Sequence, residues 1–271
     1  MPLALGPSGP KPLSYLFIDG GCMRSVIREV SKTFFNDEQP DIAWDNVRSG
    51  FTKVFYYDCI APKLDSELDN DYESRKTEQT ALFNQIRLHR GFHVFEGVMR
   101  RRRKQNVQKK VDVKIAVDML THTFMKNMDR CTLLANDLDF QPLLEALVQN
   151  GMFVTLMYRP RFTSNDLQYT ADDRHPINVR TIYGWCSTDF QSRHPMPKPT
   201  REDLHLLTTL ETIEATDGEM TISRRQRKAD RDSELVAQFG TTSYQHDNRD
   251  LLVDYMFEMF PQLGTRIDPS D

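Results

Sequence analysis

CTLLANDLDFQPLLEALVQNGMFVTLM, residues 131–157, is the stretch of sequence that decides the fold. Cys131 to Ala135 is a short apolar run that ends in a polar turn, which predicts a buried strand. From Phe140 to Val148 apolar residues recur at steps of three and four, with Pro142 in the first turn, which predicts a helix. Phe153 to Met157 predicts the next strand. A strand, a helix and a strand in this order predict a crossover between two parallel strands.

The same alternation extends along the chain on both sides of this stretch. Further strands are predicted at Leu13–Ile18, Thr52–Tyr57, Phe92–Val98 and Val179–Tyr183. Further helices are predicted over Val26–Phe35, within Ser66–Arg90 and over Val111–Met128. Because parallel neighbours need helical crossovers, this order predicts an α/β fold, a three-layer sandwich with a mostly parallel central sheet.

The composition changes after residue 186. Prolines at 195, 197 and 199 predict a stiff linker over residues 187–200. Three later segments, at 201–213, 223–239 and 248–260, are predicted to be helices. We therefore expect a tail at 1–12, a core domain at 13–186, the linker, and a C-terminal helical appendage at 201–271. The apolar stretch at 251–260 offers a surface for the core, a second copy of the chain or a protein partner, and the sequence leaves this choice open.

Charge and cysteine content exclude several classes of protein. The 271 residues include 35 Lys and Arg against 39 Asp and Glu, a net charge of −4, so a polyanion would have to bind a local basic patch. The four cysteines lie far apart without paired spacing, which argues against a zinc ribbon, a redox dithiol or a disulfide scaffold. No apolar run approaches the roughly 20 residues that cross a bilayer, and the first residues lack a signal-peptide pattern. The sequence therefore predicts a cytoplasmic protein with no membrane partner.

Aspartates stand at the predicted strand ends and helix starts. Asp19 ends the first strand, Asp112 begins a helix, and Asp137 and Asp139 follow the strand at 131–135. Because ligands of α/β sheets gather at the carboxyl ends of the strands, we expect the four side chains to face one another. Each acid alone has an ordinary alternative role as a helix cap. Together, however, four carboxylates repel unless one is protonated or a cation is bound. The set predicts a Mg²⁺ or Mn²⁺ site suited to phosphodiester cleavage by a metal-activated water.

Asp118 lies on the same predicted helix as Asp112, six residues further along. Six residues correspond to about 9 Å along the helix axis, so the two side chains cannot readily share one ion. Asp118 is therefore expected to support the site or the helix from outside the ligand set.

A basic run precedes the helix that carries Asp112. Between Phe95 and Lys114, eight basic residues stand against two acidic ones. The residues expected to contact nucleic acid are Arg100, Arg101, Arg102, Arg103, Lys104, Lys109 and Lys110. A phosphate backbone held by this run would pass near the proposed ion. A solvated, flexible loop is the alternative interpretation.

Four segments, in this order, resemble the NYN domain family of PIN-like metal-dependent nucleases. They are LFIDGG at 16–21, KKVDVKIAVDML at 109–120, LLANDLDFQPLLEAL at 133–147 and GMFVTLMY at 151–158. The resemblance covers roughly residues 13–185 and implies a PIN-like sandwich. It also implies a ribonuclease that uses Mg²⁺ or Mn²⁺, with single-stranded or structured RNA as substrate, DNA as the alternative, and endonucleolytic cleavage favoured. Carried over by position, the catalytic and metal-binding acids are Asp19, Asp112, Asp137 and Asp139.

Three departures from the family pattern lie beside these acids. Cys22 stands where the family often has Asn, Ala135 and Asn136 replace a Ser-Gly pair, and Lys110 replaces a common Gly. All four acids are present, so the resemblance implies an active enzyme.

Other functions suit part of the same pattern. In an RNA-binding or adaptor module, the acids would cap helices and the C-terminal region would recruit a partner. A glycosyltransferase would use Asp137-Leu138-Asp139 to hold a metal and a nucleoside diphosphate, but Asp19 and Asp112 would have no role. A phosphatase of the aspartyl-phosphate kind would need a second Asp two residues after Asp19, where Gly21 stands.

Overall fold

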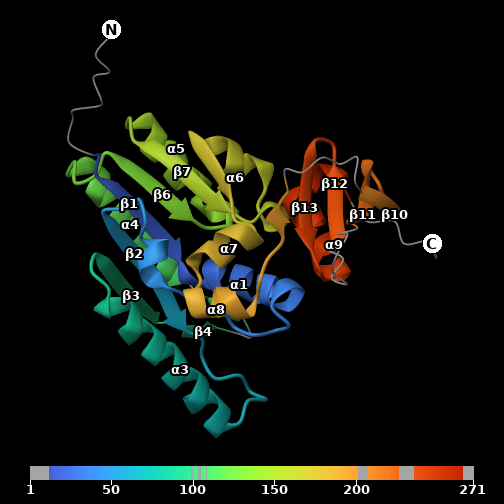
Figure 1. The fold of residues 1–271 in the computed structure, drawn as a ribbon. Helices are drawn as coiled ribbons and strands as arrows, with labels where there is room; N and C mark the ends of the chain where they lie inside the picture. The colour runs from blue at the N-terminus through green and yellow to red at the C-terminus, as the bar shows by residue number, and fades with distance from the viewer. Residues whose placement is uncertain are drawn as a thin grey trace. The chain divides into compact units, whose positions relative to one another are not determined.

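The computed structural model describes residues 12–98, 100–102, 105–107, 109–200, 207–225 and 235–264. The chain divides into two compact units, whose ribbons are drawn in Figure 1. The first unit comprises residues 1–26 and 43–177, and the second comprises residues 27–42 and 178–271. Each unit is described by itself below.

The first unit has the alternating order of strands and helices that the sequence predicts. Its strands are β1 (Ser14–Asp19), β2 (Lys53–Ile60), β3 (Phe92–Val98), β4 (Arg100–Arg102), β5 (Gln105–Val107), β6 (Arg130–Leu134), β7 (Phe153–Tyr158) and β8 (Asp173–Pro176). Its helices are α2 (Trp44–Val47), α3 (Asp69–Leu88), α4 (Lys109–Phe124), η1 (Leu138–Phe140), α5 (Gln141–Gln149), η2 (Pro160–Phe162) and α6 (Asn165–Thr170). Helix α1 (Gly20–Phe34) begins in this unit and continues into the second.

Six of these strands form one sheet in the order β3-β2-β1-β6-β7-β8. Every neighbouring pair is parallel. The strand order reverses direction beside β1, because the chain adds β2 and β3 on one side and β6 to β8 on the other. Crevices at such a reversal, outside the carboxyl ends of the strands, are the usual ligand sites of open α/β sheets.

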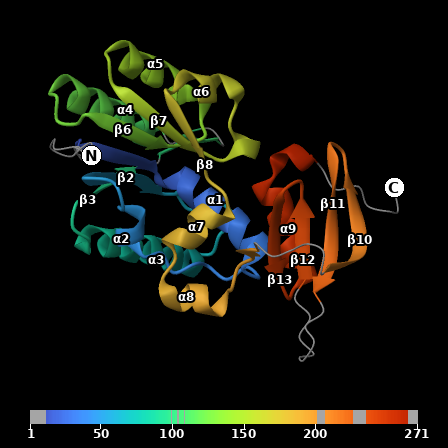
Figure 2. The ribbon, with the colours of Figure 1, turned by 45° about the horizontal axis from the view of Figure 1, so that its top comes forward.

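Helices cover both faces of the sheet, as the two views in Figures 1 and 2 show. Helices α4, α5 and α6 lie over one face, and α2 and α3 lie over the other. Along β1, Tyr15 and Phe17 join the core beneath α4, while Leu16 and Ile18 are fully buried on the opposite side. Because both faces are covered, the strand is apolar throughout instead of alternating. The predicted α/β sandwich with a mostly parallel sheet is confirmed.

Gly97 lets the start of α4 approach β3 closely. A side-chain Cβ at this position would lie 2.6 Å from Cγ2 of Val111, which is inside any real contact distance. Val111 is buried in the core, and Asp112 is its neighbour in the first turn of α4. Gly97 therefore helps to fix where Asp112 stands above the sheet.

Two expectations about the core domain need correction. Residues 179–183, predicted to be a strand, belong to helix α7 (Val179–Trp185), and the sixth strand of the sheet is β8. The side chain of Asn178 accepts a hydrogen bond from the Thr181 amide at 3.1 Å, and Oγ1 of Thr181 accepts one from the Asn178 amide at 3.4 Å. This reciprocal capping starts a helix despite the β-branched residues. The basic run at 100–104, for which a solvated, flexible loop is the alternative interpretation, includes β4, which pairs with β5.

The second unit is a mixed α and β structure. Its further elements are α8 (Thr188–Arg193), β9 (Lys198–Pro199), β10 (Leu207–Ala215), β11 (Gly218–Arg225), β12 (Leu235–Phe239), β13 (Thr242–His246), α9 (Arg249–Met259) and η4 (Pro261–Leu263). Strands β10, β11, β12, β13 and β9 form a five-stranded sheet in that order, and the pairs are antiparallel. Tyr255 of α9 lies edge-on to Tyr244 of β13, with ring centroids 5.0 Å apart.

The predicted C-terminal helical appendage is therefore wrong in most of the region that the structure describes. Only the helix at 248–260 is present, as α9. The segments predicted as helices at 201–213 and 223–239 contain β10, the end of β11 and β12. Thr216-Asp217 and Gly240-Thr241 form the tight turns of two hairpins, and Gly240 has φ +59°. The segment at 187–200, predicted to be a linker, contains α8 and β9.

None of the helices in the described part of the chain combines the length and the apolar character needed to cross a bilayer.

Candidate active site

The four predicted acids gather at the carboxyl edge of the parallel sheet. Asp19 is the last residue of β1, and Asp137 lies three residues beyond the end of β6. Strands β1 and β6 are direct neighbours, with Ile18 paired to Leu134, so these two aspartates leave adjacent strands at the same edge. Asp139 lies within η1, and Asp112 lies in the first turn of α4.

Asp19 is held rigidly at the end of its strand. Its side chain is 8% exposed, and Oδ1 accepts hydrogen bonds from the Gly21 amide at 2.9 Å and the Cys22 amide at 3.3 Å. Burial raises the pKa of Asp19, the two amides and the charge of Arg24 oppose the rise, and the charge of Asp137 adds to it. The carboxylate thus caps α1 while it feels a second carboxylate nearby.

Asp112 is the acid on which the others act most strongly. Burial, followed by the charges of Asp19, Asp137 and Asp139, raises the pKa of Asp112 to about 6. Like charges raise a carboxyl pKa only from a short distance in a partly buried setting. The four acids, about 120 residues apart at their extremes, therefore share one electrostatic environment.

Asp137 and Asp139 are exposed and stand at the start of η1. Oδ1 of Asp137 accepts a hydrogen bond from the Asp139 amide at 3.0 Å, so Asp137 also acts as a cap. Among the residues that the structure describes, no three Asp, Glu, His or Cys side chains form a ready-made group for a metal ion.

The donor set nevertheless fits a hard divalent cation in its chemistry. All four groups are carboxylates, which Mg²⁺ and Mn²⁺ prefer, and their mutual repulsion is what such an ion would relieve. Asp19 is buried and Asp112 is half-buried, whereas Asp137 and Asp139 are exposed.

Asn136, one of the departures from the family pattern, joins two loops at this edge. Its Oδ1 accepts hydrogen bonds from the Arg159 amide and from Oγ1 of Thr163, both at 2.9 Å. The backbone amide of Asn136 donates a hydrogen bond to the sulfur of Cys22. This bond lowers the pKa of the Cys22 thiol, but burial raises it by more. Asn136 therefore connects the loop that carries Asp137 to the first turn of α1 and to the segment after β7.

The structure also reveals a buried ion pair that sequence reasoning missed. Asp58, in the middle of β2, has a fully buried side chain and pairs with the guanidinium of Arg24. It also accepts hydrogen bonds from Tyr56 Oη at 3.2 Å and from the Cys59 amide at 2.7 Å. A Cβ at Gly20 would lie 2.7 Å from Oδ2 of Asp58, so only glycine fits beside the pair. The available signal was an acid inside an otherwise apolar strand.

Asp118 belongs to a separate network. Its Oδ2 accepts a hydrogen bond from Tyr57 Oη at 2.8 Å, and its other oxygen pairs with Lys114. Lys114 in turn lies 5.7 Å from the ring centroid of Phe95. Burial and the Asp118 charge raise the pKa of Tyr57. These contacts support the predicted role of Asp118 as a structural acid outside the ligand set.

The residues predicted to contact nucleic acid are only partly described. Arg100, Arg101 and Arg102 form β4, and Lys109 and Lys110 begin α4, two and three residues before Asp112. Arg103 and Lys104 lie outside the described residues. The hairpin of β4 and β5 leads directly into the helix that carries Asp112.

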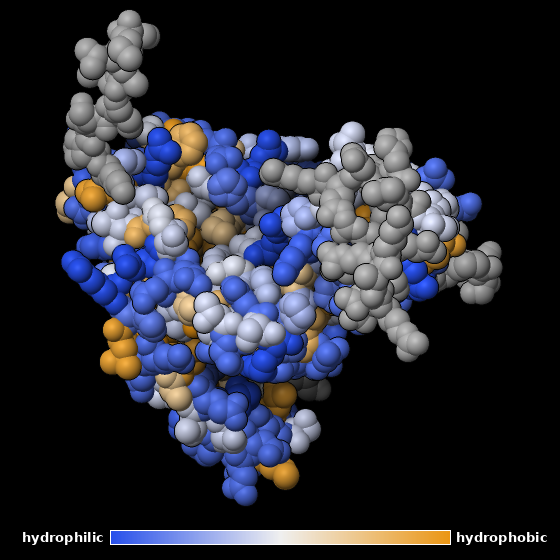
Figure 3. All heavy atoms as spheres, in the orientation of Figure 1, coloured by the Kyte–Doolittle hydropathy of each residue, from blue (hydrophilic) through white to orange (hydrophobic). Residues whose placement is uncertain are grey.

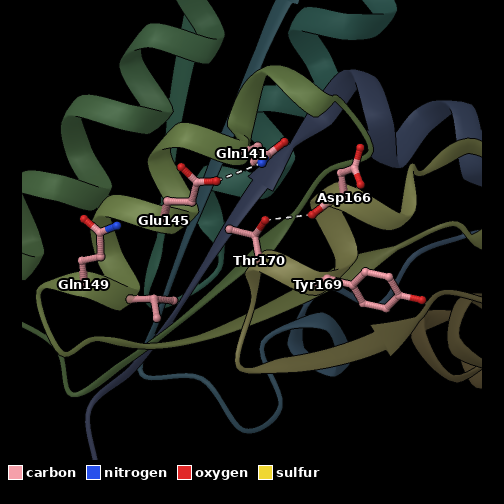
Figure 4. Close-up of a pocket in the computed structure, with 7 residues that line it drawn as sticks. Gln141, Glu145, Gln149, Asp166, Tyr169 and Thr170 are labelled. Carbon is pink, nitrogen blue, oxygen red and sulfur yellow. Dashed lines mark hydrogen bonds between the residues drawn. The ribbon is translucent and has the colours of Figure 1, made fainter.

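A groove of about 380 Å³ lies between α5 and α6 in the same unit (Figure 4). Its lining includes Gln141, Glu145, Asp166, Tyr169 and Thr170. Gln141 Nε2 donates a hydrogen bond to Glu145 at 2.9 Å. The groove contains two exposed acids and none of the four clustered aspartates, so it is poorly suited to a phosphate backbone.

Comparison with known proteins identifies one family. The NYN domain model matches residues 43–178, half of the chain, a range that includes Asp112, Asp137 and Asp139 but not Asp19. A solved structure of a protein of unknown function from Vibrio parahaemolyticus is 18% identical. The match covers 63% of this chain and 96% of that one, with a TM-score of 0.43. No curated protein matches the chain.

Proposed function

Since the chain belongs to the NYN domain family, which is generally nuclease-like, we propose that it is a metal-dependent nuclease that hydrolyses phosphodiester bonds. RNA is the substrate that we propose first, with DNA as the alternative, and internal cleavage as the favoured mode. The free cysteines suit a reducing cytoplasm as its setting.

The observation that carries the proposal is the state of Asp112. Its pKa is raised to about 6 by burial and by three other aspartates that come from β1 and from the loop after β6. Separate helix caps would not need to share an environment, and folding four carboxylates together is unfavourable without a compensating charge. A divalent cation bound by the set is the simplest compensation.

Asp19, Asp112, Asp137 and Asp139 are the residues that would hold Mg²⁺ or Mn²⁺. Bound there, the ion would lower the pKa of the attacking water and neutralise charge on the scissile phosphate. The chain contributes orientation, because the Gly21 and Cys22 amides fix Asp19. Asp112, with its pKa near 6, is mainly ionised at neutral pH and can then serve as a ligand.

The basic run at 100–110 supports a polyanionic substrate. Its backbone forms the hairpin of β4 and β5 and the first turn of α4, directly before Asp112. We propose that Arg100 to Lys104, Lys109 and Lys110 hold the sugar–phosphate backbone while the acids act on one linkage. Protein partners of the second unit, including a second copy of the chain, stay a separate proposal.

Cleavage assays with the purified full chain test this function. Fluorescent single-stranded RNA, hairpin RNA and single-stranded DNA are incubated with Mg²⁺, Mn²⁺ or EDTA, and circular RNA reports internal cleavage. We expect divalent-ion-dependent cleavage, and a loss of at least about 100-fold in Asp112→Asn and Asp137→Asn. Asp71→Asn is the matched control, because Asp71 is an exposed acid in the first turn of α3. If no substrate is cut, or if all variants cut equally, the proposal fails.

A non-catalytic RNA-binding module is the second candidate. The observation that favours it is that the described acids do not form an assembled ligand group. Such a protein should bind RNA equally well in EDTA, and its Asp112→Asn variant should bind as tightly or more tightly because one negative charge is gone. Filter binding in EDTA and in Mn²⁺ separates the two candidates.

A further inference from the structure

An exposed aromatic residue lies on a loop that leaves the sheet at the same edge as the acid cluster. Strand β7 is the parallel neighbour of β6, so the segment that follows β7 leaves the sheet at the same edge as Asp137. This segment runs from Arg159 to Thr163 and contains η2. Phe162 at its end is 59% exposed, and Leu138, between Asp137 and Asp139, is 46% exposed.

The backbone around Phe162 is held in place on both sides. Asn136 accepts hydrogen bonds from the Arg159 amide and from Thr163 Oγ1, both at 2.9 Å. Thr163 Oγ1 also lies 2.9 Å from the Arg159 carbonyl oxygen. Arg159 itself is 4% exposed and donates to the carbonyl of Ile177 at 3.1 Å. Phe162 is therefore presented to solvent by a loop that is fastened to the residue preceding Asp137.

Phe162 is one of several large apolar residues that the described part of the chain exposes. The face drawn in Figure 3 is mostly hydrophilic, and its apolar residues occur in small scattered groups. A large exposed ring on a braced loop offers a flat apolar surface, and Arg161 beside it is an exposed cation. Unpaired nucleobases stack on such rings regardless of their identity, because every base has an apolar face. The acidic groove between α5 and α6 would repel the backbone, which favours a path over the loop instead.

We propose that Phe162 is a stacking platform for one unpaired base of a single-stranded polynucleotide, next to the phosphate at the acid cluster. The inference rests on the proposed nuclease function and adds a substrate feature to it. Bases within a duplex are already stacked on both faces, so the platform selects strands that are unpaired near the scissile bond.

Binding of single-stranded RNA to the full chain tests the platform. The measurements use the Asp112→Asn background in EDTA, so that the RNA stays intact, and they compare Phe162→Ala with Phe162→Trp. Loss of one stacked base corresponds to about a 5- to 100-fold weaker Kd in Phe162→Ala, and the tryptophan variant should bind like the parent. Phe124→Ala is the matched control. Phe124 is 64% exposed, at the opposite end of α4 from Asp112.

An abasic scan separates stacking from a general loss of fold or charge. Single nucleotides of the RNA are replaced one by one by abasic residues. In the parent, one or two positions should weaken binding, and in Phe162→Ala those positions should have no further effect. Equal binding by Phe162→Ala and the parent, or an equal loss on every oligonucleotide and on duplex RNA, overturns the platform and leaves the nuclease function standing. If no nucleic acid binds with or without Mn²⁺, both proposals fail together.

Discussion

Removing the charge of Asp58 should destabilise the first unit more than any surface ion pair can. Asp58→Asn keeps the size of the side chain and leaves Arg24 without its anionic partner. Asp58 is fully buried, and the Arg24 side chain is 37% exposed. Breaking one half of a buried pair typically costs about 3–5 kcal/mol, because the remaining charge is desolvated and unpaired. Water can reach part of Arg24, so we expect a loss at or below the lower limit of this range, about 2–3 kcal/mol.

Urea unfolding followed by Trp44 fluorescence measures this loss. The chain has two tryptophans, and Trp185 belongs to the second unit, so a Trp185→Phe background leaves a reporter of the first unit alone. Trp44 is 3% exposed and lies edge-on to Tyr56, with ring centroids 5.8 Å apart. With an m value of about 2 kcal/mol/M, the midpoint should fall by about 1–1.5 M.

A double-mutant cycle shows whether the pair itself is responsible. Arg24→Met with Asp58→Asn should lose less than the sum of the single changes, because no orphaned charge is left. Glu73→Gln is the control, since the Glu73–Lys76 pair on α3 is exposed on both sides and should cost less than about 0.5 kcal/mol. The reasoning is refuted if Asp58→Asn lowers the free energy of unfolding as little as Glu73→Gln does. It is also refuted if the losses of Arg24→Met and Asp58→Asn add up in the double variant.

Three further predictions concern the same unit. In EDTA, the free energy of unfolding should fall as the pH rises from about 4 to about 6. Folding raises the pKa of Asp112 from 3.8 to about 6, so the folded chain binds that proton more tightly than the unfolded chain. Thermal melting should show a weaker fall in Asp112→Asn, and an unchanged slope contradicts the assignment. Gly97→Ala should lower stability by about 1–3 kcal/mol, because its Cβ would meet Val111, and Val111→Ala should recover part of the loss in the same urea assay. The cysteine thiols should react slowly with Ellman's reagent at neutral pH in the native chain, because burial raises all four pKa values, including that of Cys131 to about 12. A rapid burst of one thiol would show that at least one of them is activated instead.

The central sheet could be predicted because its signals are local. The apolar runs at β1, β6 and β7 are buried on both faces, and the three- and four-residue spacing before Gly151 marks α5 within one residue at each end. In the second unit the local signals conflict. Residues 207–215 contain both helix-forming Leu and Glu and β-branched Thr and Ile, and pairing with β11 decides for a strand. The dipeptide Asp217-Gly218, which is common at hairpin turns, was the available sign of that hairpin.

The acids could be placed at one edge from their positions in the chain, but their supports could not. Strand order determines where Asp19 and Asp137 emerge, and this follows from the alternation of strands and helices. The pairing of Arg24 with Asp58 joins a helix to a neighbouring strand across the sheet, and no spacing in the sequence encodes it. The bonds of Asn136 to Arg159 and Thr163 are likewise contacts over more than 20 residues.

If the acid cluster binds a divalent cation as proposed, the charges around it explain why Arg24 does not take the place of that ion. Arg24 is the cation whose charge lowers the pKa of Asp19, yet its guanidinium is already paired with the buried Asp58. The pair is neutral as a whole, so it offsets little of the negative charge of Asp19, Asp112, Asp137 and Asp139. Burial raises the pKa of Asp112, and the charges of the other three aspartates add to that rise. If Arg24 were free to swing onto Asp19, it would compete with an ion for that ligand. Asp58 prevents this by holding the guanidinium in an ion pair, which leaves the edge of the sheet available for the proposed divalent cation.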